Sequence, residues 1–194
     1  MNNLIKDSLF QGELVRLKMD NPEILAKAFS RWEKDSEYGR LLDGGARQLF
    51  SAKIIQSWIE KDLEKDPGQD FFFAIHILES DLLIGFVSLF WIDWNHGNTW
   101  VGIGLGEREY WGKGYGTDAM REILKYAFTE LNLHRVTLGV FEYNPRAIRS
   151  YEKAGFVHEG RVRKELLKDG QRWDVLEMGI LREEWQKKMK GANQ

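Results

Sequence analysis

The stretch "YWGKGYGTDAM", Tyr110–Met120, places glycines at every second position, at 112, 114 and 116. The segment before it, "TWVGIGL" over 99–105, has the composition of a strand, and the segment after it predicts an amphipathic helix over 115–131. A glycine loop between a strand and a helix exposes backbone N–H groups at the positive end of the helix dipole, and phosphate oxygens can approach it closely. The stretch therefore predicts a pyrophosphate-binding loop, with Lys113 as a further cation at its rim.

Two other phosphate-binding loops do not fit this spacing. A Walker A loop requires Gly-Lys followed by Ser or Thr, and the chain contains no such triplet. A dinucleotide-binding fingerprint counted from Gly112 would need its third glycine at Thr117, and no early βαβ unit precedes the loop. A tight strand-to-helix connection that merely needs glycine remains the alternative interpretation.

The composition limits the classes of protein to which the chain can belong. Its 194 residues are 43% hydrophobic and 30% charged, which is typical of one globular domain spanning 1–194. The absence of cysteine excludes disulfides, cysteine-ligated zinc and a cysteine nucleophile. No signal peptide or membrane-spanning run is visible, so we expect a cytoplasmic protein without a membrane partner. A net charge of −2 argues against a nucleic-acid partner, which only the basic cluster "GRVRK", Gly160–Lys164, favours.

The rest of the chain predicts a mixed α/β protein. Seven strands are predicted, over 13–19, 71–78, 82–92, 99–105 and 135–141, and then two strands joined at Asp169-Gly170. Besides the helix over 115–131, two helices are predicted between residues 22 and 66, divided by "LLDGGARQ", and a short one over Pro145–Gly155. Meandering strands come first and crossovers follow, which differs from a doubly wound fold.

A second motif, "NPRAIRSYEKAGF" from Asn144 to Phe156, follows the strand that comes after the glycine loop. Together the two motifs closely resemble the GNAT superfamily of acetyl-CoA-dependent N-acetyltransferases, and more narrowly its branch of ribosomal-protein N-terminal (RimJ/RimL-like) and spermidine acetyltransferases. The resemblance covers about 99–185. It implies an α/β (α+β) fold with a mixed, mostly antiparallel sheet of about seven strands, flanked by about four helices. The parallel central strands, 99–105 and 135–141, would splay apart to admit the cofactor.

The resemblance also implies acetyl-CoA as co-substrate, no metal, and direct attack of an amine on the thioester within a ternary complex. The pantetheine arm would pair with the backbone around 104–106. Asn144 matches the residue that hydrogen-bonds this arm, although Asn before Pro is also a good helix cap. Tyr151 matches the tyrosine that protonates the leaving thiolate. The expected cofactor-binding residues are Leu105, Gly106, Trp111, Gly112, Lys113, Gly114, Tyr115, Gly116, Thr117 and Asn144.

One position departs from the loop that the superfamily usually carries, Arg/Gln-x-x-Gly-x-Gly/Ala. Trp111 stands at the Arg/Gln position, while Gly114 and Gly116 match the two small positions. The departure removes one expected side-chain contact with the pyrophosphate. The departure does not affect the binding of pyrophosphate by the backbone N–H groups of the loop, because these groups do not depend on side-chain identity.

The sequence indicates the residues that bind the acceptor amine less clearly than those that bind the cofactor. Glu33 and Glu37 lie in an acidic stretch that is a candidate attractor for a cationic amine, although a solvated helix face explains them more simply. Trp91 and Trp173 are candidates for lining an acceptor groove, with sheet packing as the default explanation. No strong general base is evident, and Glu107 is the nearest carboxylate in sequence. This lack favours an amine of low pKa, such as an α-amino group.

Two functional hypotheses follow from these observations. The first is an N-acetyltransferase acting on a primary amine of a protein N-terminus, a polyamine or another small molecule. The second is a non-catalytic acyl-CoA-binding module that serves as a sensor or interaction domain. Tyr151 favours the enzyme, because a sensor has no need of an acid for the thiolate. The acceptor's identity and the formation of a homodimer stay open.

Overall fold

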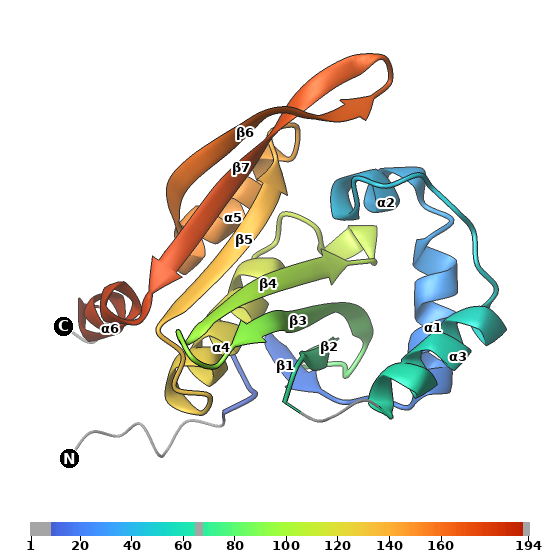
Figure 1. The fold of residues 1–194 in the computed structure, drawn as a ribbon. Coiled ribbons are helices and arrows are strands. Elements are labelled where there is room, and N and C mark those ends of the chain that lie inside the picture. The colour runs from blue at the N-terminus through green and yellow to red at the C-terminus, as the bar shows by residue number, and fades with distance from the viewer. Residues whose placement is uncertain (1–8, 65–67, 192–194) are drawn as a thin grey trace.

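A computed structural model describes residues 9–64 and 68–191 of the chain. Seven strands form one sheet in the order β1-β2-β3-β4-β5-β7-β6, and every neighbouring pair except β4 and β5 is antiparallel (Figure 1). The strands are β1 (Val15–Lys18), β2 (Phe71–Ile77), β3 (Leu83–Asp93), β4 (Asn98–Leu105), β5 (Arg135–Phe141), β6 (Val157–Lys168) and β7 (Gln171–Leu181). The predicted mixed, mostly antiparallel sheet is confirmed, and the hairpin at 169–170 joins β6 to β7.

The described chain has six α-helices where the sequence predicted about four. They are α1 (Pro22–Trp32), α2 (Ser36–Leu42), α3 (Ala52–Leu63), α4 (Tyr115–Thr129), α5 (Pro145–Ala154) and α6 (Arg182–Gly191). The first predicted helix is in fact two, because Asp35 accepts hydrogen bonds from the N–H groups of Glu37 and Tyr38 and caps a new helix there. Helix α6 was not predicted from the sequence. Trp185 is its one buried residue, and a single buried residue gives no apolar periodicity.

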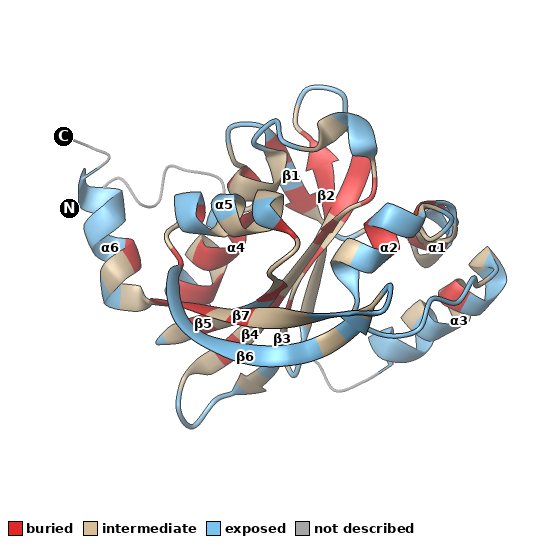
Figure 2. Cartoon of the chain, turned by 90° about the horizontal axis from the view of Figure 1, so that it is seen from above, coloured by how far each residue is buried: buried red, intermediate tan, exposed pale blue. Residues whose placement is uncertain are grey.

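The hydrophobic core has two parts, one on each face of the sheet. Ala74 and Ile75 are neighbours in β2, yet they belong to different parts, because successive side chains of a strand point to opposite faces. The larger part packs α4, including the fully buried Met120 and Ile123, and the smaller part packs α1 through Trp32. Figure 2 shows buried residues concentrated in α4 and the central strands, whereas the edge strand β6 is exposed along most of its length.

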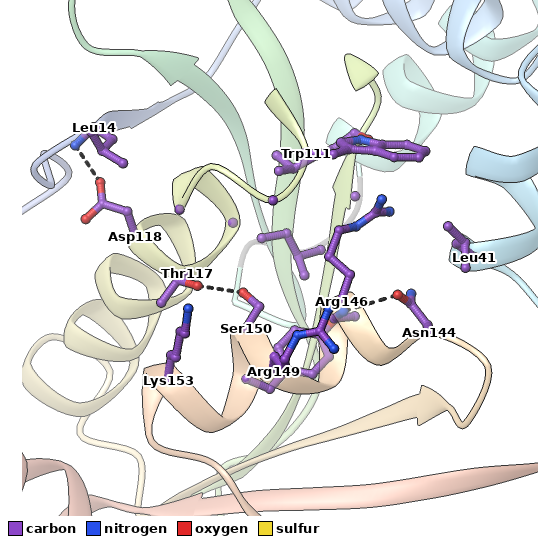
Figure 3. Close-up of a pocket in the computed structure, with 18 of the residues that line it drawn as sticks. Leu14, Leu41, Trp111, Thr117, Asp118, Asn144, Arg146, Arg149, Ser150 and Lys153 are labelled. Atoms are coloured by element: carbon purple, nitrogen blue, oxygen red, sulfur yellow. Dashed lines mark hydrogen bonds between the residues drawn. The ribbon is translucent and has the colours of Figure 1, made fainter. Parts of the chain in front are cut away.

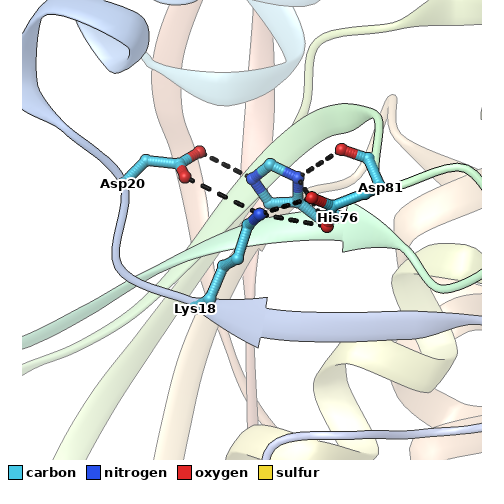
Figure 4. A network of polar contacts seen from close by, with 4 residues as sticks. All are labelled: Lys18, Asp20, His76 and Asp81. Carbon is cyan, nitrogen blue, oxygen red and sulfur yellow. Dashed lines mark hydrogen bonds and ion pairs between the residues drawn. The ribbon is translucent and has the colours of Figure 1, made fainter.

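A polar network ties the opposite edge of the sheet together (Figure 4). The ring of His76 in β2 is 4% exposed, with Nε2 2.6 Å from the Asp20 carboxylate and Nδ1 2.8 Å from the carbonyl oxygen of Asp81. Lys18 at the end of β1 places its Nζ 2.8 Å from the Asp81 carboxylate. Both ring nitrogens of His76 have polar partners, and the network joins the end of β1 to the turn between β2 and β3.

The parallel strands β4 and β5 separate soon after they meet. They pair at Asn98–Arg135, Thr99–Val136 and Trp100–Thr137. Both strands then continue, to Leu105 and Phe141, without further pairing between them in the described part of the chain. This is the splay that was predicted between 99–105 and 135–141, and it opens the middle of the sheet.

Candidate active site

A cavity of about 430 Å³ lies at this splay. Its walls come from the end of β4, the loop before α4, the first turns of α4, one face of α5 and helix α2. Figure 3 shows the side chains of α5 pointing towards the first turn of α4 across this space. Eight of the ten residues expected to bind the cofactor lie in the loop between β4 and α4 or in the first turn of α4.

The glycine loop ends in an uncapped helix. Gly112 and Gly114 have φ values of 72° and 96°, in the left-handed region that favours glycine. Gly114 is the N-cap of α4 and offers no side chain, so no side-chain hydrogen bond caps this helix. A Cβ at Gly112 would meet no protein atom within 4 Å in the described structure, because the position faces the cavity. The loop therefore presents backbone N–H groups and the helix dipole to an anion.

Trp111 joins this loop to the sheet. Its Nε1 donates a hydrogen bond to the carbonyl oxygen of Leu105 at 2.7 Å. The guanidinium of Arg146 lies 3.8 Å from the centroid of the indole ring, and that of Arg108 lies 5.1 Å from it. The residue at the usual Arg/Gln position thus holds a cation from α5 against the loop. The hydrogen bond to the Leu105 carbonyl also ties the glycine loop to the end of β4.

A buried carboxylate anchors the segment that leads into β1 against α4. Asp118 is 5% exposed and accepts hydrogen bonds from the N–H groups of Leu14 at 2.8 Å and Val15 at 3.0 Å. This contact brings Leu14 to the cavity, where its Cδ1 would lie 3.3 Å from a Cβ on Gly114. Sequence reasoning missed the role of Asp118, because its partners lie more than 100 residues away.

Two residues of the second motif line the cavity at α5. Asn144 is 8% exposed, and its Oδ1 accepts a hydrogen bond from Ala147 N–H at 3.1 Å. Asn144 is therefore the N-cap of α5, which was one of the two roles considered for it from the sequence. Its amide nitrogen is left for a ligand in the cavity. Tyr151 packs edge-on against Phe156, and burial raises the pKa of its phenol to about 12. The phenol therefore stays protonated across the neutral pH range.

A second tyrosine, which sequence reasoning missed, reaches the cavity from α2. Tyr38 is 5% exposed, and its hydroxyl would lie 3.0 Å from a Cβ on Gly104. Burial, and secondarily the negative charge of Glu33, raise the pKa of Tyr38 well above its usual value. Glu33 itself does not line the cavity; its Oε2 is buried and has no hydrogen-bond partner within 9–64 and 68–191. Glu107 is paired with Arg31 and the indole N–H of Trp32, and is not free as a base.

The structure brings together most of the expected cofactor residues. Seven of the ten line the cavity, as does the expected acid Tyr151; the seven are Leu105, Trp111, Gly112, Gly114, Gly116, Thr117 and Asn144. The other three face elsewhere. Gly106 donates its N–H to the carbonyl of Ile84 and faces the Trp32 ring, Lys113 lies over the ring of Tyr110, and the Tyr115 ring also packs on Tyr110.

The expected acceptor residues divide into two groups. Glu37 and Trp173 line a second cavity, of about 320 Å³, between α2 and the β6–β7 hairpin. Leu41 lines both cavities, so they adjoin at this residue. Trp91 lies elsewhere, 73% exposed beside Trp100 at the β3–β4 hairpin, at the opposite end of β4 from Leu105.

Comparison with known proteins agrees with this geometry. The family model described as "Acetyltransferase (GNAT) domain" matches residues 16–157. The chain belongs to the GNAT acetyltransferase family. The uncharacterized N-acetyltransferase YokL of the SPbeta prophage in Bacillus subtilis is 32% identical over 137 residues, covering 70% of this chain and 74% of YokL. The spermidine N(1)-acetyltransferase of Vibrio cholerae is 38% identical over 103 residues, which are 53% of this chain and 59% of that protein.

Solved structures extend the likeness over nearly the whole fold. The crystal structure of the Vibrio cholerae spermidine N-acetyltransferase in complex with CoA and spermine superposes with a TM-score of 0.77 at 25% identity. The superposition covers 89% of this chain and 98% of that one. The GNAT chain described here is accordingly an acetyl-CoA-dependent N-acetyltransferase, as the two motifs predicted.

The described residues show neither a metal-binding cluster nor a membrane-spanning helix. They contain no group of three or more histidine, aspartate or glutamate side chains placed to hold a metal ion. Among the helices described, none has the length and the apolar run that crossing a membrane requires.

Proposed function

We propose that this enzyme binds acetyl-CoA in the cavity at the splay and transfers the acetyl group to a small-molecule primary amine, with Tyr151 as the acid. The observation that carries the proposal is that one cavity connects an uncapped glycine-rich helix start with the open edge of β4 and with Tyr151. The pyrophosphate would lie on the amides of the loop at 112–116. The pantetheine arm would enter the splay and hydrogen-bond the amide of Asn144.

The roles follow from the charges that develop during transfer. Attack of the amine on the thioester places negative charge first on the carbonyl oxygen and then on the sulfur. Tyr38 stays protonated and lies beside Gly104 at the splay, so it is a hydrogen-bond donor available to the reacting groups. Tyr151 would give its proton to the leaving thiolate. Its low-polarity surroundings raise the pKa of a thiolate too, which keeps the two proton affinities close despite the phenol's high pKa.

The acceptor would enter through the second cavity. That cavity meets the first at Leu41 and is walled by the rings of Tyr143 and Trp173, which pack edge-on with centroids 5.3 Å apart. The carboxylate of Glu37, which also pairs with Arg108 at 2.7 Å, lines the same cavity. Aromatic faces and a carboxylate together suit an alkylammonium group. The spermidine N-acetyltransferases among the relatives support a small amine as the acceptor class.

The test is thiol release from acetyl-CoA with the purified chain and a panel of acceptors. The panel includes a polyamine, free lysine and a short peptide with an unblocked N-terminus. We expect release with the polyamine to exceed release with the peptide, and mass spectrometry to find one added acetyl group per product. Release with the peptide alone would replace the small-amine acceptor by a protein N-terminus. Binding of acetyl-CoA without release for any amine would favour the non-catalytic alternative.

A further inference from the structure

A row of basic residues follows one face of α5 along the cofactor cavity. Arg146, Arg149 and Lys153, together with Ser150, have the spacing i, i+3, i+4 and i+7, so they share one side of the helix. All four line the cavity, and Figure 3 shows this side of α5 turned towards the start of α4. Arg121 on α4 lines the same cavity. Two helices thus contribute positive charge to one space.

Three of these cations are not used by the fold. Arg121, Arg149 and Lys153 are exposed, and their side chains form no ion pair within the part of the chain that the structure describes. Some other surface arginines are held in ion pairs, as Arg108 is with Asp35 and Arg135 is with Glu159. Three unpaired cations that line one cavity give it a positive potential, which favours the binding of an anionic ligand.

A fourth cation adds to the positive potential at this end. Lys188 of α6 donates a hydrogen bond from Nζ to the carbonyl oxygen of Lys153 at 2.9 Å. Burial, and secondarily the positive charge of Arg121, lower the pKa of Lys188. The Lys188 ammonium thus contacts the backbone of α5 at Lys153 and lies within reach of the Arg121 charge.

The position of these cations relative to the glycine cradle is fixed by a contact between the two helices. The hydroxyls of Thr117 in α4 and Ser150 in α5 are 2.8 Å apart. Thr117 is in the first turn of α4, where the pyrophosphate would lie. Arg121 is four residues further along α4, about 6 Å at the rise of an α-helix, and Lys153 is three residues beyond Ser150. Arg121 and Lys153 thus lie about one helical turn beyond this contact, and Arg149 lies directly before Ser150.

Coenzyme A carries a second phosphate at a matching place. Its 3′-phosphate and its 5′-pyrophosphate are attached to the same ribose, so an enzyme that holds one places the other nearby. A phosphate monoester carries nearly two negative charges at neutral pH and accepts several hydrogen bonds from arginine and lysine. We propose that Arg121, Arg149 and Lys153 bind the 3′-phosphate of coenzyme A, so that this enzyme distinguishes acetyl-CoA from acetyl-3′-dephospho-CoA. The inference rests on the proposed cofactor site.

The experiment measures dissociation constants of CoA and 3′-dephospho-CoA by calorimetry. It uses the unmodified chain, the double variant Arg149→Gln/Lys153→Gln, and the single variant Arg121→Gln. Lys187→Gln, which removes an exposed charge from α6 outside the cavity, is the matched control. We expect the unmodified chain to bind CoA about tenfold more tightly than 3′-dephospho-CoA. The double variant should lose this preference while binding 3′-dephospho-CoA within about twofold of the unmodified chain, and Lys187→Gln should change neither constant.

Two results would overturn the assignment. Equal weakening of both ligands would show that the cations act on the pyrophosphate or only through the general field. Equal binding of both ligands by the unmodified chain would show that the 3′-phosphate is not recognised, while the proposed function would stand. If the unmodified chain binds neither ligand, the cofactor site itself fails, and the inference fails with it.

Discussion

The proposed cofactor side and the proposed acceptor side of this molecule are built in different ways. The cofactor side comes mostly from one continuous stretch, 98–155, and its central elements are backbone groups at a loop and at a helix start. The acceptor side is assembled from α2 and the β6–β7 hairpin, more than 100 residues apart. Side-chain contacts hold it together, such as the pair between Arg40 and Asp169 and the hydrogen bond from Tyr143 to the carbonyl of Arg40.

The difference teaches where each kind of specificity resides. A backbone cradle is set by glycine and by helix geometry, so it stays the same while surrounding side chains vary. An acceptor wall made of exposed side chains can change its substrate by single substitutions. The predictions below test the contrast, beginning with the largest effect.

Replacing Tyr151 by Phe should lower kcat about 100-fold, because it removes the proton donor and leaves the packing against Phe156 in place. The dissociation constant for acetyl-CoA should stay within about twofold of the original, since the phenol is not part of the cradle. Stopped-flow thiol release and calorimetry measure the two quantities separately. An unchanged kcat would remove Tyr151 from the mechanism.

Replacing Gly114 by Val should weaken acetyl-CoA binding about tenfold. The left-handed φ of 96° strains a β-branched residue, and the new Cβ would press on Leu14, so the loop amides would shift. Gly170→Val is the matched control, because Gly170 has a φ of 74° at the tip of the β6–β7 hairpin with open space around it. If both variants bind acetyl-CoA equally well, the backbone cradle is not the cofactor site.

Replacing Trp173 by Ala should raise KM for the amine about fivefold, because an aromatic wall of the second cavity is lost. Binding of acetyl-CoA should not change. Trp91→Ala is the natural control, since Trp91 is an exposed tryptophan at the other end of the sheet. Initial rates over a range of amine concentrations give both KM values. A rise for Trp91→Ala alone would place the acceptor at the β3–β4 hairpin.

The smallest effect concerns the ion pair that links the two sides. Asp35 caps α2, and its hydrogen bond with Arg108, beside the glycine loop, lowers the pKa of the carboxyl from its usual 3.8 to about 2. Asp35→Asn keeps a good cap and removes the charge. It should reduce the free energy of unfolding at pH 6 by about 1 kcal/mol, which is less than the pKa difference alone implies because Arg108 is half exposed.

The pH dependence of this contribution has a definite sign. Because the folded-state pKa of Asp35 is lowered, its stabilisation is present above about pH 4 and is lost as the pH falls towards 2. The difference between Asp35→Asn and the unmodified chain should therefore shrink between pH 4 and pH 2 in urea unfolding curves. A difference that is constant down to pH 2 would show that the ion pair does not stabilise the fold.

The sequence predicted what depends on neighbours along the chain. Glycine spacing, Pro145 at the start of α5 and Gly155 at its end were sufficient to place the loop and the helices, because these signals act within a few residues. The splay followed only from the family resemblance. The early end of α1 was not predicted, since the polar run after Trp32 gave no clear boundary.

What the sequence did not predict depends on contacts across the fold. Tyr38 lies outside both motifs, and Arg146 lies within the second motif but had no predicted role. Their place at the cavity is set by how α2 and α5 pack near β4. Trp91 and Trp173 look equivalent as isolated tryptophans near hairpins, yet Trp173 lines the second cavity and Trp91 lines neither of the two cavities described. The two tryptophans differ in strand register and in the direction of their hairpins, and neither property can be derived from the amino-acid composition.

The splay also creates two strand edges inside the molecule. Unpaired edges on a protein surface invite pairing with other chains, and proteins protect them with charge, proline or short length. The facing edges of β4 and β5 lie within the sheet, between two paired halves, so another chain cannot reach them as it can reach β6. A ligand with amide groups can fill the gap as a short extra strand. The cofactor would then complete the sheet, and amide hydrogen exchange along 101–105 should slow when CoA binds.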